Sequence, residues 1–233
     1  FIYNADDPAC VQIAKNCKAQ TAPFSLVNII ENGGYTTKTE INIAGEKFSI
    51  AECSLQGLHN LENILASLLV VSKIDWSEKS IESYRKTLQS FQSLPHRMQL
   101  VHTENGVRYF DDSKGTNVGA TVMALASLED NVILIAGGQD KGGDYSQLDG
   151  IVSAKVKELI LLGDAKEKLN QVFANTTKTT LVENMKEAVK TAKANASQGD
   201  TVLLSPACAS FDQYNNFQER GLDFQKWVKN ESV

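Results

Sequence analysis

Apolar and polar residues recur at regular intervals through most of the chain. In residues 40–50 they alternate on both sides of Gly45, which predicts two short strands joined by a turn. From Gly57 onward the period becomes helical, because leucine and isoleucine recur three or four residues apart over residues 58–69. A second helix is expected over residues 78–91, ending before Pro95.

The rest of the chain alternates strand-like and helix-like segments. Short apolar runs predict strands at residues 108–110, 131–136, 158–162, 179–182 and 201–204. Helical patterns occupy residues 118–128, 145–154, 165–173, 184–196 and 214–229. Runs such as 132–135 lack alternation, as expected for strands that helices cover on both faces. The order predicts an α/β fold with a doubly wound, mostly parallel sheet like that of dinucleotide-binding domains.

A boundary between two parts is expected at the sequence Leu94-Pro95-His96-Arg97, because regular alternation resumes just after it. We therefore divide the chain into residues 1–93 and residues 94–233. The first residues, Phe1-Ile2-Tyr3-Asn4, resemble the end of a buried strand and include neither an initiator methionine nor a signal peptide. This start predicts that the chain is a piece of a longer polypeptide.

Composition and charge narrow the classes of function. The chain of 233 residues is 42% hydrophobic and 22% charged, which is ordinary for a globular protein. The net charge of −5 is spread evenly over both parts, so neither a nucleic acid nor an anionic membrane is an expected partner. No apolar run approaches the roughly 18 residues that a membrane span requires. The four cysteines include no Cys-x-x-Cys pair, so we expect reduced thiols in the cytoplasm and no metal site.

Candidate chemistry lies where the predicted strands end, because ligands of such sheets bind outside the carboxyl ends of the strands. Polar or glycine-rich segments follow the strands at residues 111–117, 137–143, 163–164 and 205–212. None is a Gly-x-Gly-x-x-Gly dinucleotide motif or a Gly-x-x-x-x-Gly-Lys-Ser/Thr phosphate loop. A self-contained NAD dehydrogenase or P-loop NTPase is therefore disfavoured. Lys114, Lys141 and Ser210, with glycine N–H groups beside them, suit a carboxylate or phosphate, although a single such lysine is more often simply solvated.

Three further features have both a functional and an ordinary interpretation. Asp112, with Asp111, is suited to a metal or a ribose, but such residues also end strands or cap helices. Asn60 and Asn63 lie one turn apart on the face opposite the leucines, where their amides match an adenine edge or are inert. Arg97, at the boundary, can reach a phosphate when two domains close.

These features occur together in an order that resembles the Mur ligase family. The motifs are Gly57-x-His59-Asn60-x-x-Asn63, Leu94-Pro95-His96-Arg97, Asp112-Ser113-Lys114-x-Thr116-Asn117, Gly137-Gly138-x-x-Lys141 and Leu204-Ser205-Pro206-Ala207-Cys208-Ala209-Ser210. The resemblance covers nearly the whole chain. The third and fifth motifs most resemble the members that add D-glutamate to UDP-N-acetylmuramoyl-L-alanine in peptidoglycan synthesis.

The resemblance implies a domain organisation. The family has a UDP-binding domain, a central ATP-binding domain and a carboxy-terminal dinucleotide-fold domain. Residues 1–93 resemble the end of the central α/β domain, and residues 94–233 resemble the complete last domain. The phosphate loop and the ligands of Mg²⁺ are then expected in the missing amino-terminal part. The chain by itself is expected to be inactive.

The resemblance also implies a reaction and roles for residues. The family uses ATP to convert a carboxylate into an acyl phosphate, which the amine of an amino acid attacks. By this likeness the nucleotide contacts are Asn60 and Asn63 to adenine, Arg97 to the phosphates and Asp112 to the ribose. The residues implied for D-glutamate are Thr116, Lys141, Ser210, Phe217 and the backbone of Phe211, with a helix start at 210–211. Lys114 is implied to add positive potential near the acyl phosphate.

Partners and rival functions follow from the same comparison. The expected partners are small molecules, namely ATP, D-glutamate and UDP-N-acetylmuramoyl-L-alanine, and a monomer is expected. One rival is another Mur-type or folylpolyglutamate-type ligase with the same mechanism and a different amine substrate. The other rival is a non-catalytic, Rossmann-like module that binds an anion.

Overall fold

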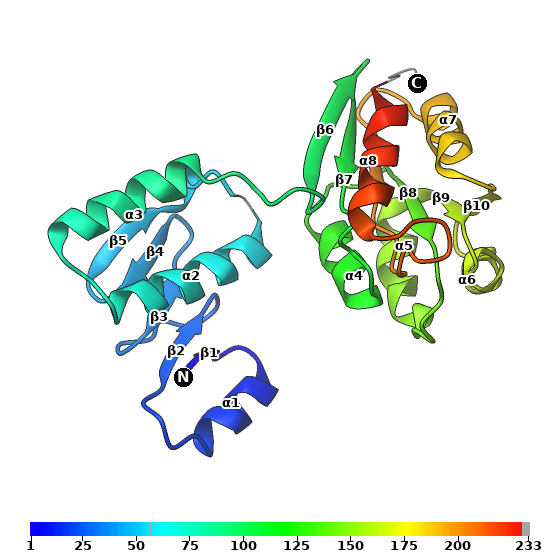
Figure 1. Cartoon of the computed structure of the whole chain (residues 1–233). Coiled ribbons are helices and arrows are strands. Elements are labelled where there is room, and N and C mark those ends of the chain that lie inside the picture. Colours follow the sequence, from blue (N-terminus) through cyan, green and yellow to red (C-terminus); the bar gives the residue numbers. More distant parts are fainter. Residues whose placement is uncertain (56, 230–233) are drawn as a thin grey trace. The chain divides into compact units, whose positions relative to one another are not determined.

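The computed structural model describes residues 1–55 and 57–229, which form two compact units, Phe1–Gln92 and Ser93–Val233 (Figure 1). Each unit has a sheet and an apolar core of its own. Both units combine helices with a sheet, as the sequence pattern predicts.

The unit Phe1–Gln92 is built on a five-stranded sheet in the order β1-β2-β3-β4-β5. The strands are β1 (Ile2–Asn4), β2 (Ala22–Ser25), β3 (Gly34–Thr36), β4 (Glu40–Ile43) and β5 (Glu46–Ser49). The helices are α1 (Pro8–Lys15), the short 3-10 helix η1 (Ile50–Glu52), α2 (Leu58–Ser72) and α3 (Glu78–Ser90). Strands β1, β2 and β3 are parallel, whereas β3, β4 and β5 pair antiparallel.

The core of this unit forms where α2 covers the sheet. Its buried side chains include Ile41 and Ile43 of β4 and Leu65 of α2, and α3 adds partly buried residues. The predicted hairpin around Gly45 and both predicted helices are confirmed. The prediction did not include α1, β2 or β3, whose three to eight residues are too short to reveal a period.

The unit Ser93–Val233 contains a six-stranded sheet in the order β10-β9-β8-β11-β7-β6. The strands are β6 (Gln99–Glu104), β7 (Val107–Asp111), β8 (Val132–Gly137), β9 (Val156–Leu162), β10 (Lys178–Leu181) and β11 (Thr201–Leu204). The helices are α4 (Val118–Ala126), the 3-10 helix η2 (Tyr145–Leu148), α5 (Asp149–Lys155), α6 (Lys166–Phe173), α7 (Met185–Asn195) and α8 (Phe217–Val228). All pairs are parallel except β6 with β7, so the predicted mostly parallel sheet is confirmed.

Helices cover both faces of this sheet, which makes the unit doubly wound. Buried side chains of α4, α5 and α6 pack on one face with Leu134 and Leu159. Those of α7 and α8 pack on the other face with Ile133 and Ile160. Successive residues of a strand point to opposite faces, so β8 and the second half of β9, residues 159–162, need apolar residues at every position. This requirement explains the unbroken apolar runs in the sequence.

The strand order places three chemically interesting loops side by side. Strand β11 lies between β8 and β7, and all three run in the same direction. Their carboxyl ends therefore meet at one edge of the sheet, although β11 is the last of them in the sequence. We call the loops that follow β7, β8 and β11 the loop edge; they comprise residues 112–117, 138–144 and 205–216.

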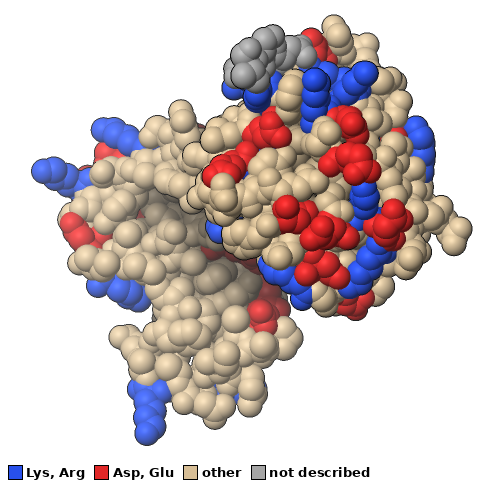
Figure 2. Space-filling view, turned by 45° about the vertical axis from the view of Figure 1, so that its right-hand side comes forward, with Lys and Arg blue, Asp and Glu red and all other residues tan. Residues whose placement is uncertain are grey.

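The surface carries no extended patch of one charge on the face of Ser93–Val233 seen in Figure 2, where acidic and basic side chains are mixed. Within the described residues, no helix combines the length and the apolar character needed to traverse a bilayer.

Candidate active site

Backbone contacts join the loops that follow β8 and β11. Gln139 N donates to Ala209 O at 3.0 Å in an isolated antiparallel bridge, and Gly137 N donates to Pro206 O at 2.9 Å. A Cβ atom at Gly138 would lie 2.2 Å from Ala209 O, so only glycine permits this approach. The loop of Lys141 therefore lies against the loop of Ser210, as expected if both serve one site.

A buried arginine connects the β7 loop, the β11 loop and α8. Arg220 is 2% exposed, and burial lowers its pKa to about 10. Its Nε donates to Ser113 Oγ at 3.0 Å and its Nη2 to Ser113 O at 2.9 Å. Its Nη1 donates to the carbonyl oxygens of Cys208 and Ala209 at 3.2 and 3.1 Å. This fork geometry suits guanidinium, which presents several donors in one plane, and it fixes two loops relative to the helix.

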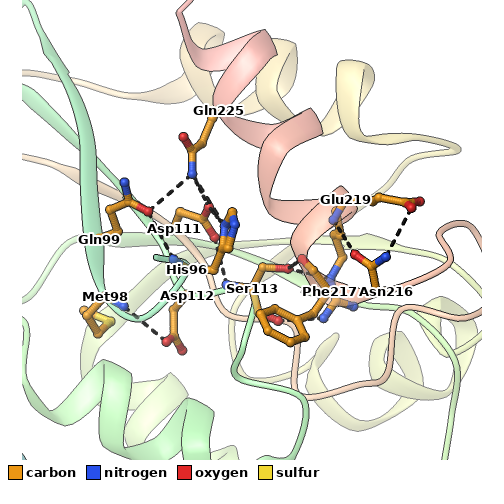
Figure 3. Close-up of polar contacts among 11 residues, drawn as sticks. His96, Met98, Gln99, Asp111, Asp112, Ser113, Asn216, Phe217, Glu219 and Gln225 are labelled. Atoms are coloured by element: carbon orange, nitrogen blue, oxygen red, sulfur yellow. Dashed lines mark hydrogen bonds and ion pairs between the residues drawn. The ribbon is translucent and has the colours of Figure 1, made fainter. Parts of the chain in front are cut away.

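A second buried network holds the segment that precedes β6 (Figure 3). His96 Nδ1 lies 2.7 Å from Asp111 Oδ2, to which Gln225 Nε2 also donates at 2.7 Å. The backbone of His96 has a φ of +62°, in the left-handed region that residues other than glycine rarely adopt. Gly221 of α8 makes the packing feasible, because a Cβ atom there would lie 2.2 Å from His96 Nδ1. The network fixes the backbone on the amino-terminal side of Arg97.

Asp112 is enclosed rather than presented to solvent. Its side chain accepts from Met98 N at 3.3 Å and from Ser205 Oγ at 2.7 Å, and the residue is 7% exposed. Burial is the main reason that its pKa is raised to about 6, while the charge of nearby Arg97 acts in the opposite direction. Arg97 itself is exposed. Each carboxylate oxygen has a second lone pair, so these bonds leave Asp112 able to accept another donor.

Lys114 and Phe217 meet at the start of α8. Lys114 Nζ lies 4.4 Å from the centroid of the Phe217 ring, and Ser113 Oγ donates to Phe217 O at 2.8 Å. The helix begins at Phe217 because Asn216 caps it, accepting from Glu219 N at 2.8 Å. The predicted starts, at residue 214 for the helix and at 210–211 for the anion-binding amide, are therefore wrong.

A turn occupies the segment where that amide was expected. Tyr214 N donates to Ser210 O at 2.9 Å, and the chain reaches helical geometry only after Asn216. Ser210 is 2% exposed, whereas the Phe211 side chain is 66% exposed. Lys141 is exposed and Thr116 half-buried, each in its own loop. The loop edge thus carries two exposed lysines, Lys114 and Lys141, and the half-buried hydroxyl residue Thr116, and groups of these kinds can bind a carboxylate or phosphate.

Asn60 and Asn63 belong to the other unit. Both lie on α2, where Asn60 is half-buried and Asn63 is exposed, away from the buried leucine positions. The side chain of His59, which belongs to the same sequence motif, lies outside the described residues. The roles expected for these asparagines and for the residues of the loop edge stay predictions. No group of three or more His, Cys, Asp or Glu side chains suited to a metal ion occurs among the described residues.

The sequence pattern did not predict that Arg220 and Gln225 would take part in buried networks, nor that Asp111 would bind His96 and Gln225. A signal for Arg220 was present, because it shares a helix face with Phe224 and Val228, four and eight residues further on, and both are fully buried. An arginine within an apolar stripe indicates a buried charge with several acceptors. Gln225 gave no comparable signal, since a glutamine on an amphipathic helix is ordinary.

Known proteins resemble this chain in sequence and fold. Residues 96–208 match the family model described as Mur ligase, glutamate ligase domain. The UDP-N-acetylmuramoylalanine--D-glutamate ligase of Citrifermentans bemidjiense is 38% identical over 98% of this chain and 51% of its own length. The protein of the same name from Christiangramia forsetii is 42% identical over 99% of this chain and 53% of its own length. The chain spans about half the length of these curated relatives.

A solved structure extends the likeness to the fold. E. coli FolC in complex with DHPP and ADP matches with a TM-score of 0.66 and 16% identity, covering 99% of this chain and 54% of that chain. At this identity the match concerns the fold alone.

Proposed function

We propose that this chain, whose residues 96–208 match the glutamate ligase domain of Mur ligases, forms part of an ATP-dependent ligase that adds D-glutamate to UDP-N-acetylmuramoyl-L-alanine. The observation that carries the proposal is the alignment of almost the entire chain with D-glutamate ligases at 38% and 42% identity. The cationic and hydroxyl groups gathered at the loop edge support it, because D-glutamate has two carboxylates. As an enzyme that consumes ATP, it is proposed to act in the cytoplasm.

The proposed reaction makes an amide in two steps. First the γ-phosphoryl group of ATP passes to the substrate carboxylate, which gives an acyl phosphate and ADP. The amine of D-glutamate then attacks the acyl carbon, and a tetrahedral intermediate expels phosphate and loses the amine proton. Such chemistry depends on positioning and on neutralising negative charge rather than on a protein nucleophile.

The residues of the loop edge suit the second step. We assign Lys141 to a D-glutamate carboxylate, with Thr116, Ser210, Phe217 and the backbone of Phe211 around the amino acid. Lys114 is assigned to the negative charge of the acyl phosphate. A cation–π contact with the Phe217 ring restrains its ammonium group beside the proposed D-glutamate residues.

The nucleotide is assigned to a different set of residues. Arg97 is assigned to the phosphates, Asp112 to the ribose hydroxyls, and Asn60 with Asn63 to the adenine. The residues described here do not fit a metal site, so no step is assigned to Mg²⁺ through this chain.

The experiment that tests the proposal is a steady-state comparison in the full-length protein. Lys141→Ala is expected to raise the KM for D-glutamate about tenfold to a hundredfold, because one charge-assisted contact contributes about 1.5–3 kcal/mol. The KM for ATP is expected to stay within twofold, because Lys141 is not assigned to the nucleotide. Lys190→Ala, which removes an exposed lysine of α7, is the matched control and is expected to change neither constant.

Two outcomes would contradict different parts of the proposal. A wild-type protein that produces ADP with another amino acid but not with D-glutamate would overturn the substrate. An unchanged KM for D-glutamate in Lys141→Ala would remove that lysine from the site and leave the activity itself standing.

A further inference from the structure

Asp140 lies in the β8 loop immediately before Lys141 and makes three polar contacts. Its Oδ1 accepts from Gly142 N at 2.9 Å and from the Tyr145 hydroxyl at 2.9 Å. Its Oδ2 pairs with Lys168 Nζ of α6 at 2.8 Å. The carboxylate therefore ties both sides of Lys141 together, because residues 140 and 142 are joined through one oxygen.

Tyr145 extends this arrangement to the neighbouring loop. Its side chain is buried, and its hydroxyl lies 3.1 Å from Cys208 Sγ, two residues before Ser210. The hydroxyl proton is directed to the Asp140 carboxylate, so the Cys208 thiol is the donor to the Tyr145 oxygen. Lys168 Nζ also lies 5.1 Å from the centroid of the Tyr145 ring. Asp140 thus connects the Lys141 loop, α6 and the Ser210 loop.

The charge state favours a persistent arrangement. Hydrogen bonding to Lys168, followed by that to Tyr145, lowers the pKa of Asp140 to about 2, so the carboxylate is ionised under ordinary conditions. Burial raises the pKa of Tyr145 and that of Cys208, so both stay protonated and retain their donor groups. Hydrogen bonds to an ionised acceptor are stronger than neutral ones.

We propose that Asp140 is a positioning residue that fixes the backbone of Lys141 and holds it in register with the Ser210 loop. The inference rests on the proposed function, in which Lys141 binds a carboxylate of D-glutamate. No substrate contact is assigned to Asp140, whose three polar contacts are all with protein groups. Asp140 therefore affects the position of the Lys141 ammonium group and takes no part in the transfer of the phosphoryl group or the formation of the amide.

The kinetic test uses the full-length protein. Asp140→Ala removes all three contacts and is expected to raise the KM for D-glutamate about tenfold, with the KM for ATP unchanged. Asp140→Asn keeps an oxygen that can accept from Gly142 and Tyr145, so its KM for D-glutamate is expected to stay within about threefold of wild type. Lys178→Met removes an ion pair with Glu158 at the amino end of the sheet and serves as the control, with both constants unchanged.

A second measurement does not depend on activity. Amide hydrogen exchange at Gly142 is expected to accelerate at least tenfold in Asp140→Ala and to remain as in wild type in Lys178→Met. Unchanged exchange at Gly142, or a KM for ATP that rises as much as the KM for D-glutamate, would overturn the positioning role. If the wild-type protein does not use D-glutamate at all, the proposed function fails, while the exchange result still decides whether Asp140 holds the loop.

Discussion

The enclosed carboxyl of Asp112 is expected to make the stability of the unit Ser93–Val233 depend on pH. Burial raises its pKa from 3.8 to about 6, so the folded state binds this proton more tightly than the unfolded chain does. The corresponding stability is complete below about pH 3.8 and is lost as the pH rises through about 6. We predict that wild type loses about 2–3 kcal/mol more free energy of unfolding than Asp112→Asn between about pH 4 and pH 7. Urea titrations of both proteins measure this difference.

A second aspartate provides the control for that experiment. The side chain of Ser146 is the main cause that lowers the pKa of Asp144, an exposed residue of the same unit. Because its pKa is lowered rather than raised, this carboxyl does not gain a proton on folding, and Asp144→Asn is expected to keep the loss of stability that wild type shows as the pH rises. Parallel pH curves for wild type and Asp112→Asn would show that the buried carboxyl does not control the stability.

Individual residues differ in how far the sequence could predict their place. Lys114, Lys141 and Ser210 lie in the polar segments that follow three apolar runs, so the edge on which they lie could be inferred from the chain alone. The join between two of their loops could not be inferred, because it depends on a bridge between Gln139 and Ala209, 70 positions apart. The enclosure of Asp112 was equally hidden, since Ser205 reaches it from another strand. Their assignment to ligands stays a prediction.

Secondary-structure elements were predictable where the chain is apolar for long enough. Strands β8 and β9, with six and seven residues, contain long apolar runs, and helix α2, with 15 residues, repeats its apolar positions over several turns. These patterns were long enough to predict the type of each element. The edge strand β6 was missed because its side chains are exposed or half-buried, which leaves only a weak alternation. The start of α8 was misplaced because apolar spacing takes no account of the cap at Asn216. The position of β11 between β8 and β7 depends on crossovers that no local pattern encodes.

The junction of the β8 and β11 loops gives a prediction about packing. Gly138→Ala is expected to lower the free energy of unfolding by more than about 2 kcal/mol, because the new Cβ would lie 2.2 Å from Ala209 O and φ is +132°. Gly142→Ala is the matched control: its φ is also positive, at +76°, but no atom lies within 4 Å of the new Cβ. Its expected cost is about 1 kcal/mol. Equal losses in urea denaturation would show that steric contact between the loops is not what requires glycine at 138.

For the whole molecule, the proposed activity requires an amino-acid site, which we assign to this chain, and a phosphate loop with a metal site, which we do not assign to it. The 233 residues contain no Gly-x-x-x-x-Gly-Lys-Ser/Thr phosphate loop, and the described residues offer no metal-binding cluster. We predict that these residues alone, given ATP, D-glutamate and UDP-N-acetylmuramoyl-L-alanine, form no ADP above the rate without protein, whereas the full-length protein does. A cooperative thermal transition of the 233-residue chain would exclude unfolding as the cause, because each unit has its own core. ADP formed by the 233 residues would contradict the dependence on a phosphate loop and place the nucleotide chemistry within this chain.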